Sequence, residues 1–244
     1  MASGIAVIVG VGPLAGLGAT LARRFAHEGL KVYVGGRTQV KIEKVAAEIK
    51  AAGNEAIPYL IDATSEAEVT GLFQRIKDRE SLPLAVVACN VDSNQRAPLL
   101  ETSSEMFKTL WQQNAYASFL VGREAARLMV SQGEGTILFT GASASLRARP
   151  PFTAFSATKF ALRAIAQGMA REFGPQGIHV AHVLIDGVID GERAQRSFPE
   201  FVAQKCNDGL LNLEAIAENY WHIHCQPKTA WTHELDLRPF KEPF

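Results

Sequence analysis

The feature that most constrains the fold is an alternation of short apolar runs, rich in β-branched residues, with longer stretches of helical periodicity. The apolar runs predict strands at residues 5–9, 31–34, 56–60, 84–88, 136–140 and 177–184, and the periodic stretches predict helices at residues 17–27, 40–50, 66–78, 104–111, 114–131 and 152–173. Strands that are apolar at every position must be covered on both faces. The sequence therefore predicts an α/β protein with a single Rossmann-type, doubly wound parallel sheet flanked by helices on both faces.

The chain of 244 residues fits one large α/β domain, and we expect residues 1–244 to form it. Residues 191–244 differ from the rest, with a polar segment followed by a helix near residues 214–224 and a short strand near residues 234–237. We expect this part to supply a substrate lid and a C-terminal edge strand.

Charge and cysteine content exclude several classes of protein. The 25 Lys and Arg residues balance 25 Asp and Glu residues, so neither a basic nucleic-acid-binding face nor a polybasic membrane anchor is expected. No apolar run approaches the roughly 18 residues of a membrane span. The three cysteines are far apart and form no CxxC pair, and the first apolar strand begins close to residue 1. We therefore expect a cytoplasmic protein.

His222 and His224 are two residues apart on a predicted helix and face different sides, so no metal site is expected.

A glycine-rich segment follows the first predicted strand and precedes the first predicted helix. It reads Gly10-Val11-Gly12-Pro13-Leu14-Ala15-Gly16-Leu17-Gly18. Glycines permit a tight turn and a close backbone approach to a pyrophosphate, and a helix N-terminus offers free N–H groups to it. The alternative is a tight turn that binds no ligand.

The spacing of Gly12, Gly16 and Gly18 resembles the glycine motif of the short-chain dehydrogenase/reductase family, although Gly10 could also serve as the first glycine. The resemblance implies that Gly12, Gly16, Leu17 and Gly18 hold the phosphates of a nicotinamide cofactor. It also implies a small-molecule substrate and a homodimer or homotetramer.

The residues after the second predicted strand indicate which cofactor is used. NAD-preferring folds place an acidic residue there for the ribose 2′-hydroxyl. Here Gly36 and Arg37 stand in that region. A guanidinium pairs with a 2′-phosphate, whereas an acid repels it, so we expect NADP(H) rather than NAD(H). A solvated Arg37 at a helix start is the alternative.

The family resemblance extends to further cofactor contacts. It implies that Asp62 meets the adenine, that Asn90 lines the adenine ribose, and that Gly187 and Ile189 hold the nicotinamide end. Asp186 stands where the family has proline, which leaves it free to face the substrate.

The catalytic motif of the family is only partly present. In Phe155-Ser156-Ala157-Thr158-Lys159 the family has Tyr-x-x-x-Lys, with tyrosine as the general acid or base. Lys159 matches and also binds the nicotinamide ribose by resemblance. Asn114 matches the residue that supports a proton relay, and Ser143 is the candidate that polarises the substrate oxygen. Phe155 occupies the position of the tyrosine and carries no proton.

Three functions remain open on this sequence. The first is an NADPH-dependent oxidoreductase that acts on a small or medium carbonyl-type substrate with an altered set of catalytic residues. The second is an imine, iminium or activated C=C reductase, with cyclase-like chemistry as one form of it, because hydride transfer to an activated carbon needs no acid at an oxygen. The third is a catalytically weak NADP-binding scaffold or sensor.

Overall fold

A computed structural model describes residues 4–205 and 208–241 of the chain, which form one seven-stranded sheet. The strands are β1 (Ile5–Val9), β2 (Lys31–Gly36), β3 (Ala56–Leu60), β4 (Leu84–Cys89), β5 (Gly135–Thr140), β6 (Ile178–Ile185) and β7 (Glu234–Leu237). Their spatial order is β3-β2-β1-β4-β5-β6-β7, and every neighbouring pair is parallel. The predicted doubly wound parallel sheet is therefore confirmed.

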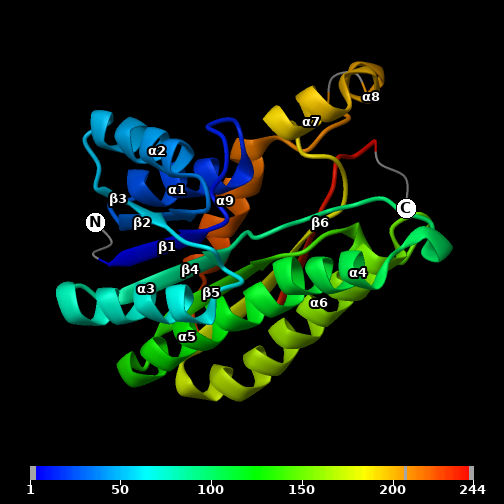
Figure 1. Ribbon diagram of the computed structural model, residues 1–244. Coiled ribbons are helices and arrows are strands. Elements are labelled where there is room, and N and C mark those ends of the chain that lie inside the picture. Colours follow the sequence, from blue (N-terminus) through cyan, green and yellow to red (C-terminus); the bar gives the residue numbers. More distant parts are fainter. Residues whose placement is uncertain (1–3, 206–207, 242–244) are drawn as a thin grey trace.

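Helices cover both faces of this sheet (Figure 1). They are α1 (Leu17–His27), α2 (Gln39–Ala51), α3 (Glu66–Arg79), α4 (Ser104–Trp111), α5 (Ala117–Gln132), α6 (Thr153–Phe173), α7 (Glu192–Ser197), α8 (Pro199–Gln204) and α9 (Leu213–His224). The side chains of α1, α2 and α9 share one core cluster, and those of α3, α5 and α6 share the other.

The alternation of strand side chains explains the two clusters. In β1, Ile5, Val7 and Val9 belong to the cluster beneath α3, α5 and α6, whereas Ala6 and Ile8 belong to the cluster beneath α1, α2 and α9. Successive side chains of a strand point to opposite faces, so a strand covered on both sides must be apolar throughout.

The chain reverses its direction of winding between β1 and β4. The first three strands proceed outward from β1 on one side, and after β3 the chain returns to place β4 on the other side of β1. In open α/β sheets, ligands bind beyond the carboxyl ends of the strands at this reversal. The segments that follow β1 and β4 therefore define where the site is expected.

The C-terminal segment divides into two parts. Helix α9 packs against α1, where Phe25 and Trp221 meet edge to face with ring centroids 5.8 Å apart and Arg24 hydrogen-bonds to Glu218 at 2.8 Å. Helices α7 and α8 lie after β6 and extend away from the sheet (Figure 1). Strand β7 pairs with β6 at the sheet edge. Helix α9 thus belongs to the core of the domain.

Within residues 4–205 and 208–241, no helix combines the length and the apolar character needed to cross a membrane.

Candidate active site

The glycine-rich turn contains glycines with two different environments. A Cβ on Gly18 would lie 2.8 Å from the Gly10 carbonyl oxygen, so Gly18 is required by close packing between the turn and α1. Gly10 itself has a φ of +97°, in the region that favours glycine. A Cβ on Gly12 would meet nothing within 4 Å. Gly12 therefore leaves a clear approach to the backbone.

Helix α1 begins directly after this turn. Gly16 is its N-cap and offers no side-chain hydrogen bond to the first helical N–H groups, and no acidic residue stands in the first turn. Unpaired N–H groups at a helix N-terminus attract an anion. The turn and the start of α1, including Leu17, thus fit the phosphates of a dinucleotide.

The ends of β2 and β3 hold the next two predicted residues. Gly36 packs so closely that a Cβ would lie 2.4 Å from the Val11 carbonyl oxygen, and the exposed Arg37 follows it. Asp62 follows β3, where its Oδ1 accepts hydrogen bonds from the backbone N and the hydroxyl of Thr64, at 2.9 and 2.8 Å. Asp62 therefore stabilises the turn before α3. Among its described contacts, none is with Arg37.

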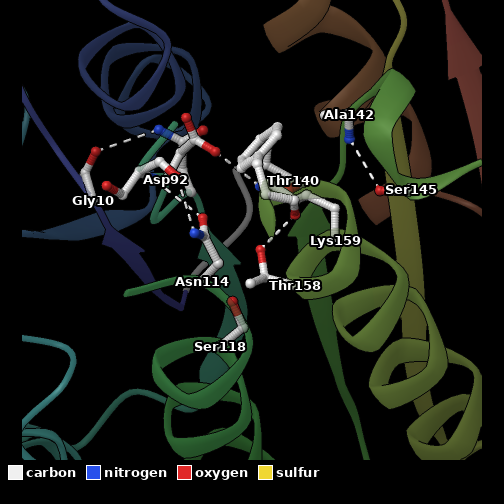
Figure 2. Close-up of polar contacts among 12 residues, drawn as sticks. Gly10, Asp92, Asn114, Ser118, Thr140, Ala142, Ser145, Thr158 and Lys159 are labelled. Carbon is white, nitrogen blue, oxygen red and sulfur yellow. Dashed lines mark hydrogen bonds and ion pairs between the residues drawn. The ribbon is translucent and has the colours of Figure 1, made fainter. Parts of the chain in front are cut away.

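Lys159 is the centre of the site. It lies on α6 and is only 1% exposed, and its Nζ is 3.0 Å from Asp92 Oδ1 and 3.3 Å from the Thr140 carbonyl oxygen (Figure 2). A buried ammonium is costly unless it is paired and hydrogen-bonded. The Asp92 carboxylate and the Thr140 carbonyl together satisfy this need.

Phe155 lies one helical turn before Lys159. Its ring is 5% exposed, and Lys159 Nζ is 5.6 Å from the ring centroid. The ring face attracts the ammonium, but it has no atom that exchanges a proton. Position 155 therefore brings no phenol to this lysine.

Asn114 holds the loop that follows β4. It lies in a π-helical turn, Gln112–Tyr116, between α4 and α5, and its side chain is fully buried. Its Oδ1 accepts a hydrogen bond from Ser93 N at 3.1 Å, and its Nδ2 donates to Ser93 O and Leu110 O, both at 2.9 Å. π-Helical turns often occur at functional sites. Here the turn places the Asn114 amide where it binds both the backbone N–H and the backbone carbonyl of Ser93, in the loop after β4.

Asn90 fastens the other end of the same loop. Its Nδ2 donates to the Gly10 carbonyl oxygen at 3.3 Å, which joins the segment after β4 to the glycine-rich turn after β1. The structure therefore places Asn90 at the point where the winding reverses.

Ser143 begins a short 3-10 turn, Ser143–Ser145, which follows β5 and packs against α6. Asp186, at the end of β6, binds the guanidinium of Arg147 through both oxygens, at 2.7 and 2.9 Å, and also contacts Arg238. Burial alone would raise the pKa of Asp186, but hydrogen bonds from Ser143 and Arg147 outweigh it and lower that pKa. Asp186 is thus an ionised anchor beside Ser143 rather than a free side chain.

Gly187 and Ile189 continue from Asp186 toward α7. A Cβ on Gly187, whose φ is +156°, would lie 2.9 Å from Pro239 Cδ. Ile189 forms an isolated parallel bridge with Leu211. Both residues lie beyond the carboxyl end of β6, where the C-terminal segment packs over the strand ends.

Asp92 is the residue that sequence analysis missed. It pairs with Lys159 through Oδ1 and with Arg193 of α7 through Oδ2, at 3.0 and 3.1 Å. A charged residue shortly after an otherwise apolar strand, at the reversal of winding, was the available signal. Its partner on a distant helix was not visible in the spacing of residues.

Comparison with known proteins agrees with this geometry. Residues 5–199 match the family described as short chain dehydrogenase. The crystal structure of a short-chain dehydrogenase from Rhodopseudomonas palustris is 39% identical, covers 98% of this chain and 99% of its own, and superposes with a TM-score of 0.82.

Two curated relatives are also similar. Gluconate 5-dehydrogenase of Gluconobacter oxydans (strain 621H) is 31% identical over 165 residues, which are 68% of this chain and 64% of the relative, slightly less than two thirds of its length. Dehydrogenase/reductase SDR family member 11 of Homo sapiens is 27% identical over 95% of this chain and 93% of its own. With a family match across most of its length and a sheet of the same kind, the chain belongs to the short-chain dehydrogenase family of oxidoreductases.

Proposed function

We propose that the protein is an NADPH-dependent oxidoreductase that transfers hydride to a small or medium carbonyl-type substrate. The observation that carries the proposal is the buried Lys159 ammonium, which contacts Asp92 after β4 and the Thr140 carbonyl at the end of β5. These contacts lie at the same edge of the sheet as the glycine turn after β1, which leads into a helix without a side-chain cap. A positive group and free N–H groups at this place suit a dinucleotide.

The cofactor contacts follow from the positions described above. The open face of Gly12 and the uncapped start of α1 suit the pyrophosphate, and the exposed Arg37 suits a 2′-phosphate. The residues proposed to hold the cofactor are Gly12, Gly16, Leu17, Gly18, Arg37, Asp62, Asn90, Lys159, Gly187 and Ile189.

The nicotinamide supplies or accepts the hydride when it is bound. The protein's own residues orient the reactants: Lys159 binds the ribose, the Ser143 hydroxyl turns from Asp186 to the substrate oxygen, and Asn114 keeps the loop at Ser93 in place. Asp186 and Arg147 hold the surroundings of Ser143 rigid. Preorganised donors of this kind stabilise charge that develops on the substrate oxygen.

Phe155 favours a second candidate, the reduction of an imine, an iminium or an activated C=C bond. A general acid contributes about 10²–10⁴-fold to ordinary carbonyl reduction, and a phenyl ring supplies none of it. An already cationic carbon accepts hydride without such an acid. A catalytically weak NADP-binding scaffold or sensor is the outcome if neither substrate class turns over.

One experiment separates these functions. NADPH and NADH are titrated against the protein by nucleotide fluorescence, and NADPH oxidation is then followed with matched panels of ketones, hydroxy-acid-derived ketones such as oxidised gluconate, and imines. Turnover of ketones supports the main proposal, and turnover confined to imines or enones supports the second. Tight binding without turnover leaves the scaffold function, and no NADPH binding at all refutes all three.

We further place the enzyme in the cytoplasm as a homodimer or homotetramer. Both described cysteines, Cys89 and Cys225, are free thiols, which suits a reducing compartment. Phe119 of α5 and Phe160 of α6 are 38% and 42% exposed on helices that cover one face of the sheet. Light scattering of the wild type and of Phe160→Glu tests this assembly, since a charge in a buried interface dissociates it.

A further inference from the structure

We propose that Asp92 exchanges the proton with the substrate oxygen, in place of the hydroxyl that Phe155 lacks. This inference rests on the proposed function, because it concerns a substrate that is oxidised or reduced at the Lys159 site. It assigns a catalytic role to a side chain of the loop after β4, whereas Phe155 and Lys159 both lie on α6.

The Asp92 carboxylate and the Phe155 ring both lie beside the Lys159 ammonium. Asp92 Oδ1 is 3.0 Å from Lys159 Nζ (Figure 2). The centroid of the Phe155 ring is 5.6 Å from the same nitrogen. Among residues 4–205 and 208–241, Asp92 is the carboxylate that pairs with this ammonium. The site thus has an ionisable oxygen beside its buried lysine, supplied by the loop after β4 instead of by α6.

Asp92 is also accessible, unlike the lysine that it contacts. Its side chain is 33% exposed, whereas that of Lys159 is 1% exposed. Each carboxylate oxygen has more than one acceptor position, so the contacts to Lys159 and to Arg193 leave room for a substrate hydroxyl.

The backbone on both sides of Asp92 is held firmly. Asn90 donates to the Gly10 carbonyl oxygen, and Asn114 binds both the N–H and the carbonyl of Ser93. A reacting group must be held within a small fraction of an ångström of its working position. The buried Asn114 therefore acts as a positioning residue for Asp92.

The other ionisable groups nearby are engaged elsewhere. The Tyr220 hydroxyl is fully buried and lies 2.7 Å from the Thr140 hydroxyl, and burial raises its pKa. The Asp186 carboxylate is bound by Arg147 and Arg238. Neither group contacts the lysine, whereas the Asp92 carboxylate does.

The step balances in both directions. In oxidation, the substrate C–H bond breaks and its hydride passes to NADP⁺, the O–H bond breaks and its proton passes to the Asp92 carboxylate, and a C=O bond forms. In reduction, the hydride would pass to the substrate carbon from the nicotinamide held at this site, the C=O bond would become a C–O single bond, and the Asp92 carboxyl group would give its proton to the oxygen. The carboxylate that remains pairs with Lys159 and Arg193.

The test compares Asp92→Asn, Phe155→Tyr and the double variant with the wild type, using a ketone and the corresponding alcohol found in the screen above. Asparagine keeps the shape of Asp92 but carries no exchangeable acid. We expect Asp92→Asn to lower kcat by about 10²–10⁴-fold, the usual contribution of a general acid or base. We expect Phe155→Tyr to restore most of the lost kcat when it is added to Asp92→Asn.

Cofactor binding provides the second readout and also reports folding. The Kd for NADPH, measured by fluorescence, should stay within a few-fold of the wild type in Asp92→Asn. Asp78→Asn, which changes an exposed carboxylate on α3, is the matched control and should leave both kcat and Kd unchanged.

Three results overturn the inference. An unchanged kcat in Asp92→Asn shows that the carboxylate takes no part. A loss of NADPH binding together with kcat, without rescue by Phe155→Tyr, shows a purely structural role. A wild type that binds NADPH but turns over no substrate defeats the proposed function and this inference together, whereas the first two results leave the proposed function standing.

Discussion

The amide of Asn114 binds both backbone groups of Ser93, with Oδ1 3.1 Å from the nitrogen and Nδ2 2.9 Å from the oxygen. This relationship couples the π-helical turn between α4 and α5 to the loop that carries Asp92. Because the Asn114 side chain is fully buried and binds two elements, it contributes to the stability of the fold as well as to the geometry of the site.

We expect Asn114→Ala to destabilise the fold by about 1–3 kcal/mol, because it leaves buried backbone groups without partners. Asn114→Asp should be at least as harmful, since a carboxylate cannot donate to Ser93 O and Leu110 O. Urea denaturation measures both. Gln112→Ala, an exposed position in the same turn, is the control, and an equal loss there would contradict the role assigned to Asn114.

We propose that Arg37 sets the preference for a phosphorylated cofactor. We expect Arg37→Ala to weaken NADPH binding by about 10–100-fold, the effect of losing a charge-assisted hydrogen bond, and to leave NADH binding almost unchanged. Isothermal titration at two salt concentrations measures both affinities. Lys41→Ala removes a nearby exposed charge on α2 and controls for general electrostatics. Equal losses for NADPH and NADH would refute the assignment.

Gly12 and Gly18 should respond in opposite ways to the same added methyl group. A Cβ on Gly18 would lie 2.8 Å from Gly10 O, so Gly18→Ala should lower the melting temperature by several degrees, as a strained contact costs about 1–3 kcal/mol. A Cβ on Gly12 meets nothing within 4 Å, so Gly12→Ala should keep the wild-type melting temperature.

The cofactor reveals the difference at Gly12. If the pyrophosphate approaches this backbone, Gly12→Ala should weaken NADPH binding by 10-fold or more, roughly 1.4 kcal/mol. Thermal unfolding with and without NADPH measures stability and binding in one series. An unchanged affinity in Gly12→Ala would place the phosphates elsewhere.

Histidines whose pKa is lowered by burial make the fold sensitive to acid, and His179 is among them. Burial lowers the pKa of His182 to about 4, and burial likewise lowers the pKa of His224 to about 4. The unfolded chain, with histidine pKa values near 6.5, therefore binds more protons than the folded chain between about pH 4 and pH 6.5. Stability is complete above pH 6.5 and falls as the pH drops through this window, by about 3 kcal/mol for each histidine.

Denaturant unfolding between pH 4.5 and pH 7.5 checks this slope. We expect His224→Gln to flatten it, because glutamine cannot take up the proton, whereas His27→Gln should leave it unchanged since the His27 side chain is 81% exposed. A slope that is the same in the wild type and in His224→Gln would show that His224 does not couple folding to protons.

Most of the fold could be predicted from local pattern. The apolar run at residues 5–9 must be buried on both faces, and the structure confirms it as β1 at the centre of a parallel sheet. The predicted helix at residues 40–50 differs from α2 by one residue at each end, since helix ends depend on capping as well as on periodicity.

Other elements depended on tertiary contacts. The sequence pattern predicted a helix from residue 114, but α5 begins at Ala117. A π-helical turn precedes it, and in this turn Asn114 hydrogen-bonds to Ser93. Residues 192–204 were expected as a polar segment and form α7 and α8. Periodicity does not show that an ion pair between Arg193 and the distant Asp92 connects α7 to the loop after β4.

The sequence by itself determined the sheet, the glycine turn and the absence of a phenol beside Lys159, because each of these follows from residue type and from spacing along one element. Only the tertiary structure decided what stands next to that lysine. Asp92 lies 67 residues earlier in the chain, and it reaches Lys159 because parallel strands bring the carboxyl ends of β4 and β5 to the same edge of the sheet. Contacts of this kind depend on the complete packing of strands and helices, which local periodicity does not encode.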